Sequence, residues 1–348
     1  MDLVILAVAF VTILLGAELF TNGIEWFGHK LGLAEGAVGS VLAAVGTALP
    51  ETMIPLIAIL VTGTEAANEV GVGAILGAPF MLSTLAMFVT GIAVLIAGRR
   101  RPDGDVMSVS TAVLGHDMRY FAVAYGIAIG VAFVPAEIQW ARWAVAVVLL
   151  GLYAHYVWEH LRAEAVAGDP ADLAPLRLHR LDRGAPAHLI MPRLRIVTVQ
   201  VVVALACIVA GAYAFVGAVE GLAQSFGVQE ALLALVIAPI ATELPEKFNS
   251  VLWVRQGKDT LAMGNITGAM VFQSTIPTVV ALIFASSHWA VTGASGLVFI
   301  SAAIAFLSSA AIFIPMVRRG RLRGRGLLVG GAFYVGYIGL VIANLRPA

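Results

Sequence analysis

Charged residues are scarce in this chain of 348 residues. Asp, Glu, Lys and Arg make up 12% of it, whereas a typical soluble domain has about 25%. Hydrophobic residues account for 60%. So few charges cannot cover the surface of a water-soluble globule of this size, and the sequence therefore predicts a polytopic membrane protein whose main surroundings are the lipid bilayer.

Other residues and motifs are missing as well. Cys207 is the only cysteine, so the chain cannot form an internal disulfide. Positive and negative charges balance, with 21 Lys and Arg against 21 Asp and Glu, which argues against nucleic acid as a partner. The sequence contains no Walker A motif, so ATP-driven chemistry by this polypeptide alone has no support. We expect neither an enzyme nor a resident cofactor.

Long hydrophobic runs are what the chain has instead. Ten of them are long enough to cross a bilayer core of about 30 Å. Most connections between them are short, which predicts one integrated all-α membrane region. The ten predicted transmembrane helices lie near residues 3–27, 36–62, 70–97, 112–134, 139–161, 195–222, 229–254, 260–286, 290–316 and 326–345.

Lys and Arg fall on alternate loops between these helices. Positive residues stay on the cytoplasmic side of a membrane, so the alternation predicts an N-terminus outside the cell membrane. Of the 21 basic residues, only Arg142, Lys247 and Arg346 lie outside these loops and the helix segments that adjoin them. Residues 162–194 are rich in Ala, Pro, Arg and Asp, and we expect them to form a cytoplasmic linker.

The sequence also resembles itself when it is shifted by 195 residues. Each half then contains five predicted helices, residues 1–161 and 195–348. Because five is an odd number, the second half must be upside down relative to the first, which predicts two inverted repeats. Matched pairs include Gly16 with Gly211, Glu25 with Glu220, Thr47 with Thr242, Pro50 with Pro245, and Glu51 with Glu246.

The strongest chemical signal is the sequence from Gly46 to Glu51 within the second predicted helix. Pro50 has no N–H, so the carbonyl of Gly46 loses its helical donor. Thr47 and Glu51 are four residues apart and therefore share a helix face. A carboxylate at membrane depth is costly unless it has a partner or a function, which makes this face a candidate ion site.

The seventh predicted helix repeats this arrangement. Pro245 releases the carbonyl of Ala241, while Thr242 and Glu246 supply a hydroxyl and a carboxylate. Hard oxygen ligands of this kind favour Ca²⁺, Na⁺ or Mn²⁺ over soft metals. A lone Glu beside a Pro can be a kink with a protonated acid, but packing alone gives no reason for two such acids in matching positions.

The sequences Gly-Thr-Ala-Leu-Pro-Glu and Ala-Thr-Glu-Leu-Pro-Glu, each followed by a Gly-rich helix, resemble the two alpha repeats of the calcium/cation antiporter superfamily. This group includes the sodium/calcium exchangers and their prokaryotic relatives. The resemblance covers nearly the whole chain and implies alternating-access exchange of Ca²⁺ for Na⁺ or H⁺. It also implies that Thr47, Glu51, Thr242 and Glu246 match the central ligands of the family.

This chain departs from the family pattern in ways that make the expected site asymmetric. Ala48 and Glu243 stand where the family usually has serine. In the helix after the first motif, nearly every polar ligand is missing, with Ala74, Ala78 and Leu82 in those positions. The second half keeps two of these polar residues. The predicted cation ligands are Thr47, Glu51, Thr242, Glu246, Glu243, Gln273 and the carbonyls of Gly46 and Ala241, with Lys247 and Asn265 as modulating residues.

Glu243 and Lys247 are four residues apart, a spacing that favours an ion pair on one helix. In one interpretation, Lys247 is a built-in counter-charge that occupies the place of a sodium ion. In another, Glu243 is a titrating carboxylate that couples transport to protons. In a third, the pair compensates itself away from the ion pathway.

Other polar groups within the predicted helices are weaker signals. Glu25 and Glu220 match in the repeat, which leaves a shared structural or gating role open, but both lie near helix ends and we expect them to be solvated. His155, Glu159 and His160 lack the spacing of a zinc protease, and an interfacial position is the preferred interpretation.

The sequence thus favours a secondary cation antiporter. An ion-binding relative that is inactive in transport, or a channel, would retain the same acids, and the lost polar residues keep both open. An intramembrane hydrolase would also explain buried carboxylates, but it explains neither the repeat nor the paired threonines. The sequence does not indicate an oligomeric state.

Overall fold

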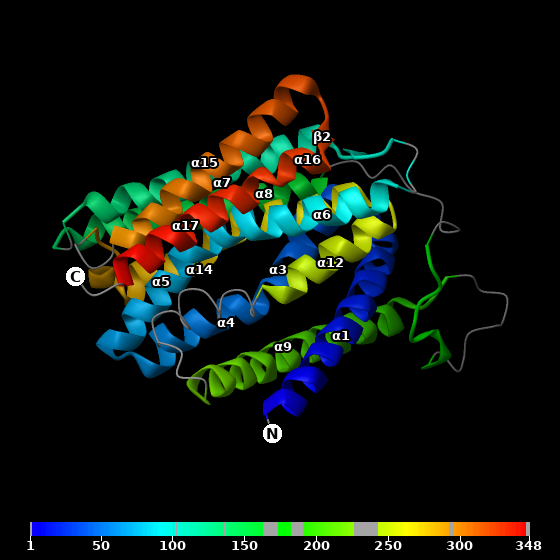
Figure 1. The fold of residues 1–348 in the computed structure, drawn as a ribbon, viewed down its shortest axis with the longest axis horizontal. Coiled ribbons are helices and arrows are strands. Elements are labelled where there is room, and N and C mark those ends of the chain that lie inside the picture. Colours follow the sequence, from blue (N-terminus) through cyan, green and yellow to red (C-terminus); the bar gives the residue numbers. More distant parts are fainter. Residues whose placement is uncertain are drawn as a thin grey trace.

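The computed structural model of this chain is a bundle of helices (Figure 1). It describes residues 2–99, 101, 103–135, 137–162, 173–181, 191–225, 243–291 and 296–345. In the first half the elements are α1 (Asp2–Lys30), α2 (Glu35–Ala37), η1 (Val38–Ala43), α3 (Ala44–Thr47), α4 (Leu49–Ile57), η2 (Ala58–Thr62), α5 (Glu65–Met81), η3 (Leu82–Ala86), α6 (Met87–Gly98), β1 (Val106–Met107), α7 (Thr111–Gly130), η4 (Val131–Phe133) and α8 (Gln139–Arg162). In the second half they are η6 (His179–Leu181), α9 (Leu194–Ser225), α12 (Leu244–Arg255), α13 (Asp259–Gln273), α14 (Ile276–Phe284), η8 (Ser286–His288), α15 (Gly296–Arg319), β2 (Leu322–Arg323), α16 (Gly324–Leu327) and α17 (Val329–Leu345).

Among the described residues, seven helices are long and apolar enough to span a membrane, or eight if a bent pair counts as one span. The helical membrane class is therefore confirmed, whereas the count of ten and the inverted layout stay predictions. Helix α7 lies in the fourth predicted span, and α12 lies in the seventh. The part of the seventh span before residue 243 is not among the described residues. The chain is also not wholly helical, because β1 and β2 pair antiparallel over two residues each.

Helix α13 forms the centre of the bundle. All of its residues from Asp259 to Gln273 are buried. Its small residues allow a close approach to η1, since a Cβ added at Gly268 would lie 2.0 Å from the Ser40 carbonyl oxygen. Gly264 makes a similar contact with Ser40. Without a hydrophobic driving force between helices in lipid, such close backbone packing holds membrane helices together.

Helices α1 and α9 lie side by side at one edge of the bundle (Figure 1). A Cβ added at Gly16 would meet Ile208 and the carbonyl of Ala204, and one added at Gly211 would meet Ile13 and the carbonyl of Ala9. Adding 195 to the α1 residues of these contacts gives their α9 counterparts, so the two contacts are the same contact with the two helices exchanged. A two-fold relation between the halves would produce this reciprocity.

Part of the linker rests on the same two helices. Trp26 Nε1 donates to the Ala174 carbonyl at 2.8 Å, and the Leu178 N–H donates to Gln200 Oε1 at 2.8 Å. Leu176 is buried between Trp26 and Val197. Residues 173–181 therefore bridge α1 and α9.

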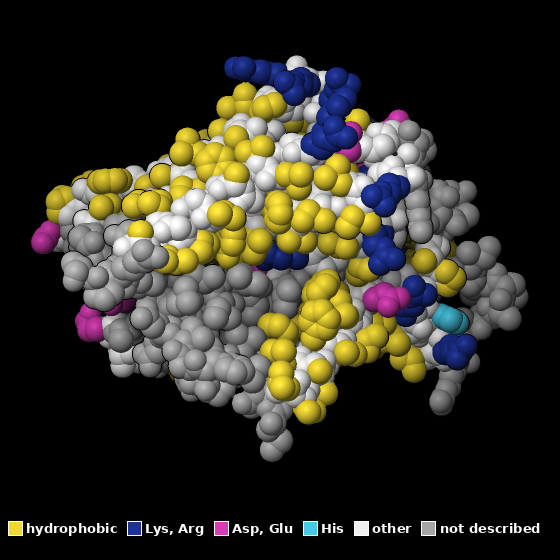
Figure 2. Space-filling model, in the orientation of Figure 1, with side chains coloured by type: hydrophobic (Ala, Val, Ile, Leu, Met, Phe, Trp, Pro, Cys, Tyr) yellow, Lys and Arg dark blue, Asp and Glu magenta, His cyan; other side chains and the backbone are white. Residues whose placement is uncertain are grey.

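The outer surface of the bundle is apolar between two ends of different charge. Figure 2 shows hydrophobic side chains across the face formed by α6, α15 and α17. On this face, Lys and Arg gather at the end where β2 and α16 lie, with a few acidic side chains among them, while the charged side chains visible at the opposite end are acidic. Loops that alternate along the chain would place their Lys and Arg at the same end of the bundle, and the gathering of basic side chains on this face is consistent with that expectation.

Candidate cation site

The second predicted span bends where the sequence places its proline. Residues 35–47 and 51–61 meet at an angle of 53°. Helix α3 ends at Thr47 and α4 begins at Leu49, so the bend lies where Pro50 removes a helical donor. Thr47 is fully buried and Glu51 is 9% exposed, which places a hydroxyl and a carboxylate next to the break.

Gln273, at the end of α13, contacts Glu51 directly. Its side-chain Nε2 donates to Glu51 Oε1 and, at 3.0 Å, to the hydroxyl of Thr52. Helix α13 ends here, with Pro277 in the first turn of α14 after the break. The break between α13 and α14 thus places Gln273 against the acid of the other half.

Asn265 connects the two proline motifs from one helical face of α13. Its Oδ1 lies 3.0 Å from Thr47 Oγ1, and its Nδ2 donates to the Glu246 carbonyl at 3.4 Å. Both Asn265 and Glu246 are fully buried. A single amide therefore holds the first and second motifs in register.

The carboxylates themselves are incompletely partnered. Neither oxygen of Glu246, nor Oε2 of Glu51, receives a hydrogen bond from another described residue. The two acids interact electrostatically with each other and with Glu243. Buried carboxylates without donors are costly unless a cation balances them, so this cluster has the chemistry of a cation site.

The two halves of the cluster are unequal, as the sequence predicts. At the shift of 191 residues that relates the Gly-rich helices, Gln273 corresponds to Leu82. Leu82 is fully buried and has no group that could donate to Glu246. Glu51 therefore receives a hydrogen bond from Gln273, whereas the corresponding residue in the other half, Leu82, can donate none to Glu246.

Glu243 and Lys247 form the predicted ion pair. The Nζ of Lys247 lies 2.7 Å from Glu243 Oε2, and both side chains are buried. Lys247 also interacts electrostatically with Glu51 and Glu246. The interpretation that places the pair away from the ion pathway is therefore weakened, because its charges act on both central acids.

Some predicted ligands cannot be placed. Ala241 and Thr242 lie outside the described residues. Gly46 is described, and a Cβ added there would lie 2.9 Å from the ring of Phe20, so it fits closely against α1. The structure brings the described ligands together, but their roles stay predictions.

Sequence reasoning missed two polar residues near the site. Thr52 accepts the second hydrogen bond of Gln273. Asn249 is fully buried one turn after Glu246, and neither its Nδ2 nor its Oδ1 bonds to a described residue. An asparagine three residues beyond an intramembrane acid lies on the same helix face, and that spacing was the available signal.

One expectation about a weaker signal is wrong. Glu25 is not solvated: it is 8% exposed, accepts a hydrogen bond from Trp253 Nε1 at 2.8 Å and pairs with Lys258. This pairing ties α1 to the end of α12, because the buried acid needs a counter-charge there. His160 is buried within the protein, at 6% exposure, and its neighbour Glu159 is partly exposed; the expected interfacial position of these residues stays a prediction.

Comparisons with known proteins show the family of the chain and its fold. The family model for the sodium/calcium exchanger protein matches residues 1–160 and 196–345. CaxA of Alkalimonas amylolytica, a protein named as an antiporter, is 31% identical over 144 residues. That alignment covers 41% of this chain and 43% of CaxA, so it spans less than half of either protein.

Solved structures of the sodium-calcium exchanger NCX_Mj share the fold. The form soaked with 2.5 mM Na⁺ and 0.1 mM Sr²⁺ matches with a TM-score of 0.72 at 16% identity, covering 99% of this chain and 100% of the other. The form soaked with 10 mM Na⁺ without Ca²⁺ matches with a TM-score of 0.71 at 17% identity, covering 99% of both chains. At such low identity, the likeness concerns the fold.

Proposed function

Because the chain belongs to the sodium/calcium exchanger protein family, we propose that it is a secondary antiporter that exchanges Ca²⁺, or a similar divalent cation, for Na⁺ or H⁺. The observation that carries this proposal is the set of three carboxylate oxygens on Glu51 and Glu246 that receive no hydrogen bond from a described residue. Oxygen ligands of this kind suit Ca²⁺ and Na⁺.

Charge balance limits what the cluster can hold. Three carboxylates, on Glu51, Glu243 and Glu246, face one ammonium, on Lys247. When all four groups are ionised, two negative charges remain. One divalent cation or two monovalent cations would neutralise them, so exchange between the two kinds of ion would keep the buried site neutral.

Lys247 fits the interpretation of a built-in counter-charge. Its Nζ occupies a position 2.7 Å from Glu243, where a bound Na⁺ would otherwise neutralise the same carboxylate. A covalently attached cation cannot be transported. We infer that this part of the site serves charge balance and that the transported ions bind at Glu51 and Glu246.

Alternating access would open the site to each side of the membrane in turn. Helices α1 and α9, which pack closely on each other at one edge of the bundle, would move as the gating pair. Gly46, next to the site, packs against Phe20 of α1. A shift of α1 would therefore change the environment of the proline break.

Transport in proteoliposomes tests the proposal. Vesicles that contain the purified protein and are loaded with radioactive Ca²⁺ should release the ion when a Na⁺ gradient or a pH gradient is imposed. The gradient that drives this release identifies the counter-ion. Glu51→Gln and Glu246→Gln should each abolish the flux. Glu35→Gln, which removes an exposed acid, is the matched control.

Two results would reject the exchanger. Ca²⁺ flux that needs no counter-ion gradient would indicate a channel. Absence of flux with either gradient, together with unchanged Ca²⁺ binding in both Gln variants, would show that the cluster binds no transported cation.

A further inference from the structure

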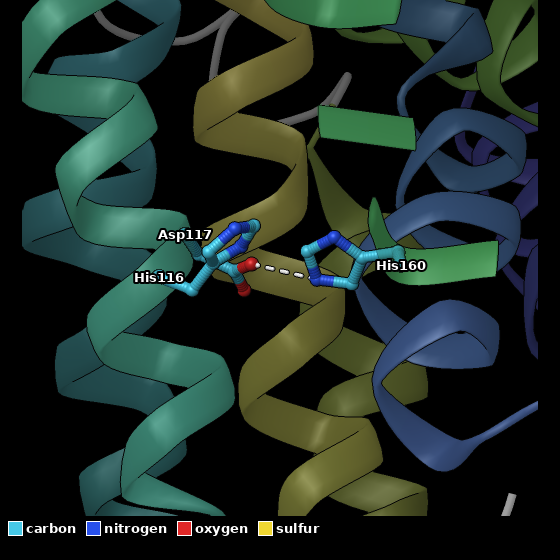
Figure 3. A group of neighbouring side chains, drawn as sticks. All are labelled: His116, Asp117 and His160. Atoms are coloured by element: carbon cyan, nitrogen blue, oxygen red, sulfur yellow. Dashed lines mark ion pairs between the residues drawn. The ribbon is translucent and has the colours of Figure 1, made fainter. Parts of the chain in front are cut away.

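A second cluster of ligand-forming side chains lies between α7 and α8, outside the cation site. It consists of His116, Asp117 and His160. One ligand atom of each residue lies within 4.8 Å of the others. Figure 3 shows the side chains of α7 and of His160 converging, with the His160 ring directed at the Asp117 carboxylate. Asp117 is fully buried.

The hydrogen bond of His160 fixes which of its ring nitrogens carries a proton. Nδ1 lies 3.0 Å from the carbonyl of Tyr156, which can only accept, so Nδ1 donates. Nε2 lies 3.2 Å from Asp117 Oδ1. In the neutral ring this places a nitrogen lone pair opposite a buried carboxylate, an arrangement that a cation between them would stabilise.

His116 is oriented in the same manner. Its Nε2 lies 2.8 Å from Glu159 Oε2, and an ionised carboxylate only accepts. Nε2 therefore donates, which leaves Nδ1 with the lone pair. Histidines that bind metals almost always donate their other N–H to a carboxylate or a backbone carbonyl, and these two histidines use one partner of each kind.

The carboxylate is also held in position. Ser40 donates to Asp117 Oδ2 at 2.8 Å, Thr267 donates to the same oxygen at 2.5 Å, and the Tyr156 hydroxyl lies 3.0 Å from Oδ1. Hydrogen-bonded ligating carboxylates complete the supporting shell of a metal site. All three ligands therefore have the outer partners that such a site requires.

We propose that His116, Asp117 and His160 form a second metal site, selective for a divalent first-row transition metal such as Zn²⁺ or Co²⁺. Two imidazoles and one carboxylate suit these ions, whereas Ca²⁺ prefers oxygen alone. Tetrahedral bonds of about 2.1 Å place ligand atoms about 3.4 Å apart, so binding draws the three side chains together. The side chain of His116 is 31% exposed and gives the ion a path of entry.

This site is joined to the cation site through helices that the two share. Ser40 belongs to η1 and Thr267 to α13, and α13 also carries Asn265 and Gln273. A bound metal would fix α7 and α8 against these two elements. The second site is thus positioned to restrain transport, although its existence does not depend on the proposed function.

Metal binding to the purified full chain tests the proposal. The double variant Glu51→Gln and Glu246→Gln removes the acids of the cation site and serves as the background. In it, calorimetry should detect about one equivalent of bound Zn²⁺, and Co²⁺ should give the visible absorption bands of a four-coordinate ion. His116→Gln and His160→Gln should each abolish both signals.

Further variants separate ligation from folding. Glu159→Gln, at a partly exposed position, should weaken Zn²⁺ binding by about 10–100-fold, as expected for an outer partner of a ligand. His288→Gln should have no effect, because His288 has a similar carboxylate partner, Glu65, without the other two ligands. Thermal unfolding of each variant provides the check on folding.

Two outcomes would overturn the proposal. Zn²⁺ binding that survives in both His116→Gln and His160→Gln would place the ion elsewhere. Absence of Zn²⁺ and Co²⁺ binding in the background variant would show that Asp117 and His160 are held together by a proton alone.

Discussion

Gln273 is the residue that most clearly distinguishes the two halves of the cation cluster. It donates to Glu51 and Thr52, and its counterpart Leu82 can do neither. In the proposed exchanger, this amide orients one of the two central acids. Its contribution should therefore appear in ion affinity more than in folding.

Gln273→Leu should weaken Ca²⁺ binding by about 10–100-fold, the usual cost of losing a partner that orients a metal ligand. Calorimetric titration of the purified protein measures this change. Ser274→Ala is the matched control, since among the described residues the Ser274 hydroxyl bonds to the Val271 carbonyl alone. Equal losses in both variants would contradict a specific role for Gln273.

Lys247 allows a second test at this scale. Removing one partner of a buried ion pair lowers the stability of the fold by about 3–5 kcal/mol, because the other charge is left unpaired. The double variant Glu243→Gln and Lys247→Met removes both charges, so it is the stability control for Lys247→Ala. If Lys247 replaces a sodium ion, Lys247→Ala should change the Na⁺ dependence of transport more than the Ca²⁺ affinity. Flux assays at varied Na⁺ measure the first, and Ca²⁺ titration the second. Equal effects on both ions would count against the idea.

At the scale of elements, the crossing of α13 and η1 positions both clusters of polar residues. Gly268 faces the Ser40 backbone at this crossing, and Asn265 and Thr267 lie within one turn of it. Any side chain at Gly268 would separate the two elements. The cation site and the proposed metal site would then both lose their geometry.

Gly268→Ala should destabilise the protein by about 1–3 kcal/mol, the usual cost of overpacking, or more, because the obstacle is backbone. It should also abolish Ca²⁺ transport. Thermal unfolding and flux measure the two effects. Gly126→Ala is the control, since a Cβ there meets nothing within 4 Å; a loss of the same size in that variant would contradict the packing explanation.

The elements differ in how far the sequence predicts them. Pro50 predicts the bend of the second span, because a missing N–H is a property of one residue. The π-helical segments η1 and η3 have no comparable local cause, and they were not expected. The cluster of His116, Asp117 and His160 depends on contact between two helices, so spacing within α8 alone directed attention to His155 and Glu159 instead. Asp117, an acid in an apolar span, was the signal available in the sequence.

At the scale of the whole molecule, Lys and Arg gather at one end of the bundle (Figure 2). This distribution predicts its orientation, with the end that carries β2 in the cytoplasm. The arginines beyond α15 should then be inaccessible from outside the cell. The loop before α8 should be accessible.

Single cysteines in a Cys207→Ser background test this orientation. Glu137→Cys and Arg321→Cys are both exposed positions, so they differ only in the predicted side. A membrane-impermeant maleimide added to intact cells should label Glu137→Cys and leave Arg321→Cys unlabelled until the membrane is opened. Labelling in the reverse order would invert the proposed topology.

The contact between α1 and α9 gives this protein a natural reporter. Cys207 is half-buried, and its Cβ would lie 3.2 Å from a Cβ built at Gly16. A thiol reacts only when the reagent can reach it, so the alkylation rate of Cys207 should depend on how closely α1 packs against α9. With no other sulfhydryl in the chain, the unmodified protein should reveal any movement of α1 against α9 as a change in that rate when Na⁺ replaces Ca²⁺.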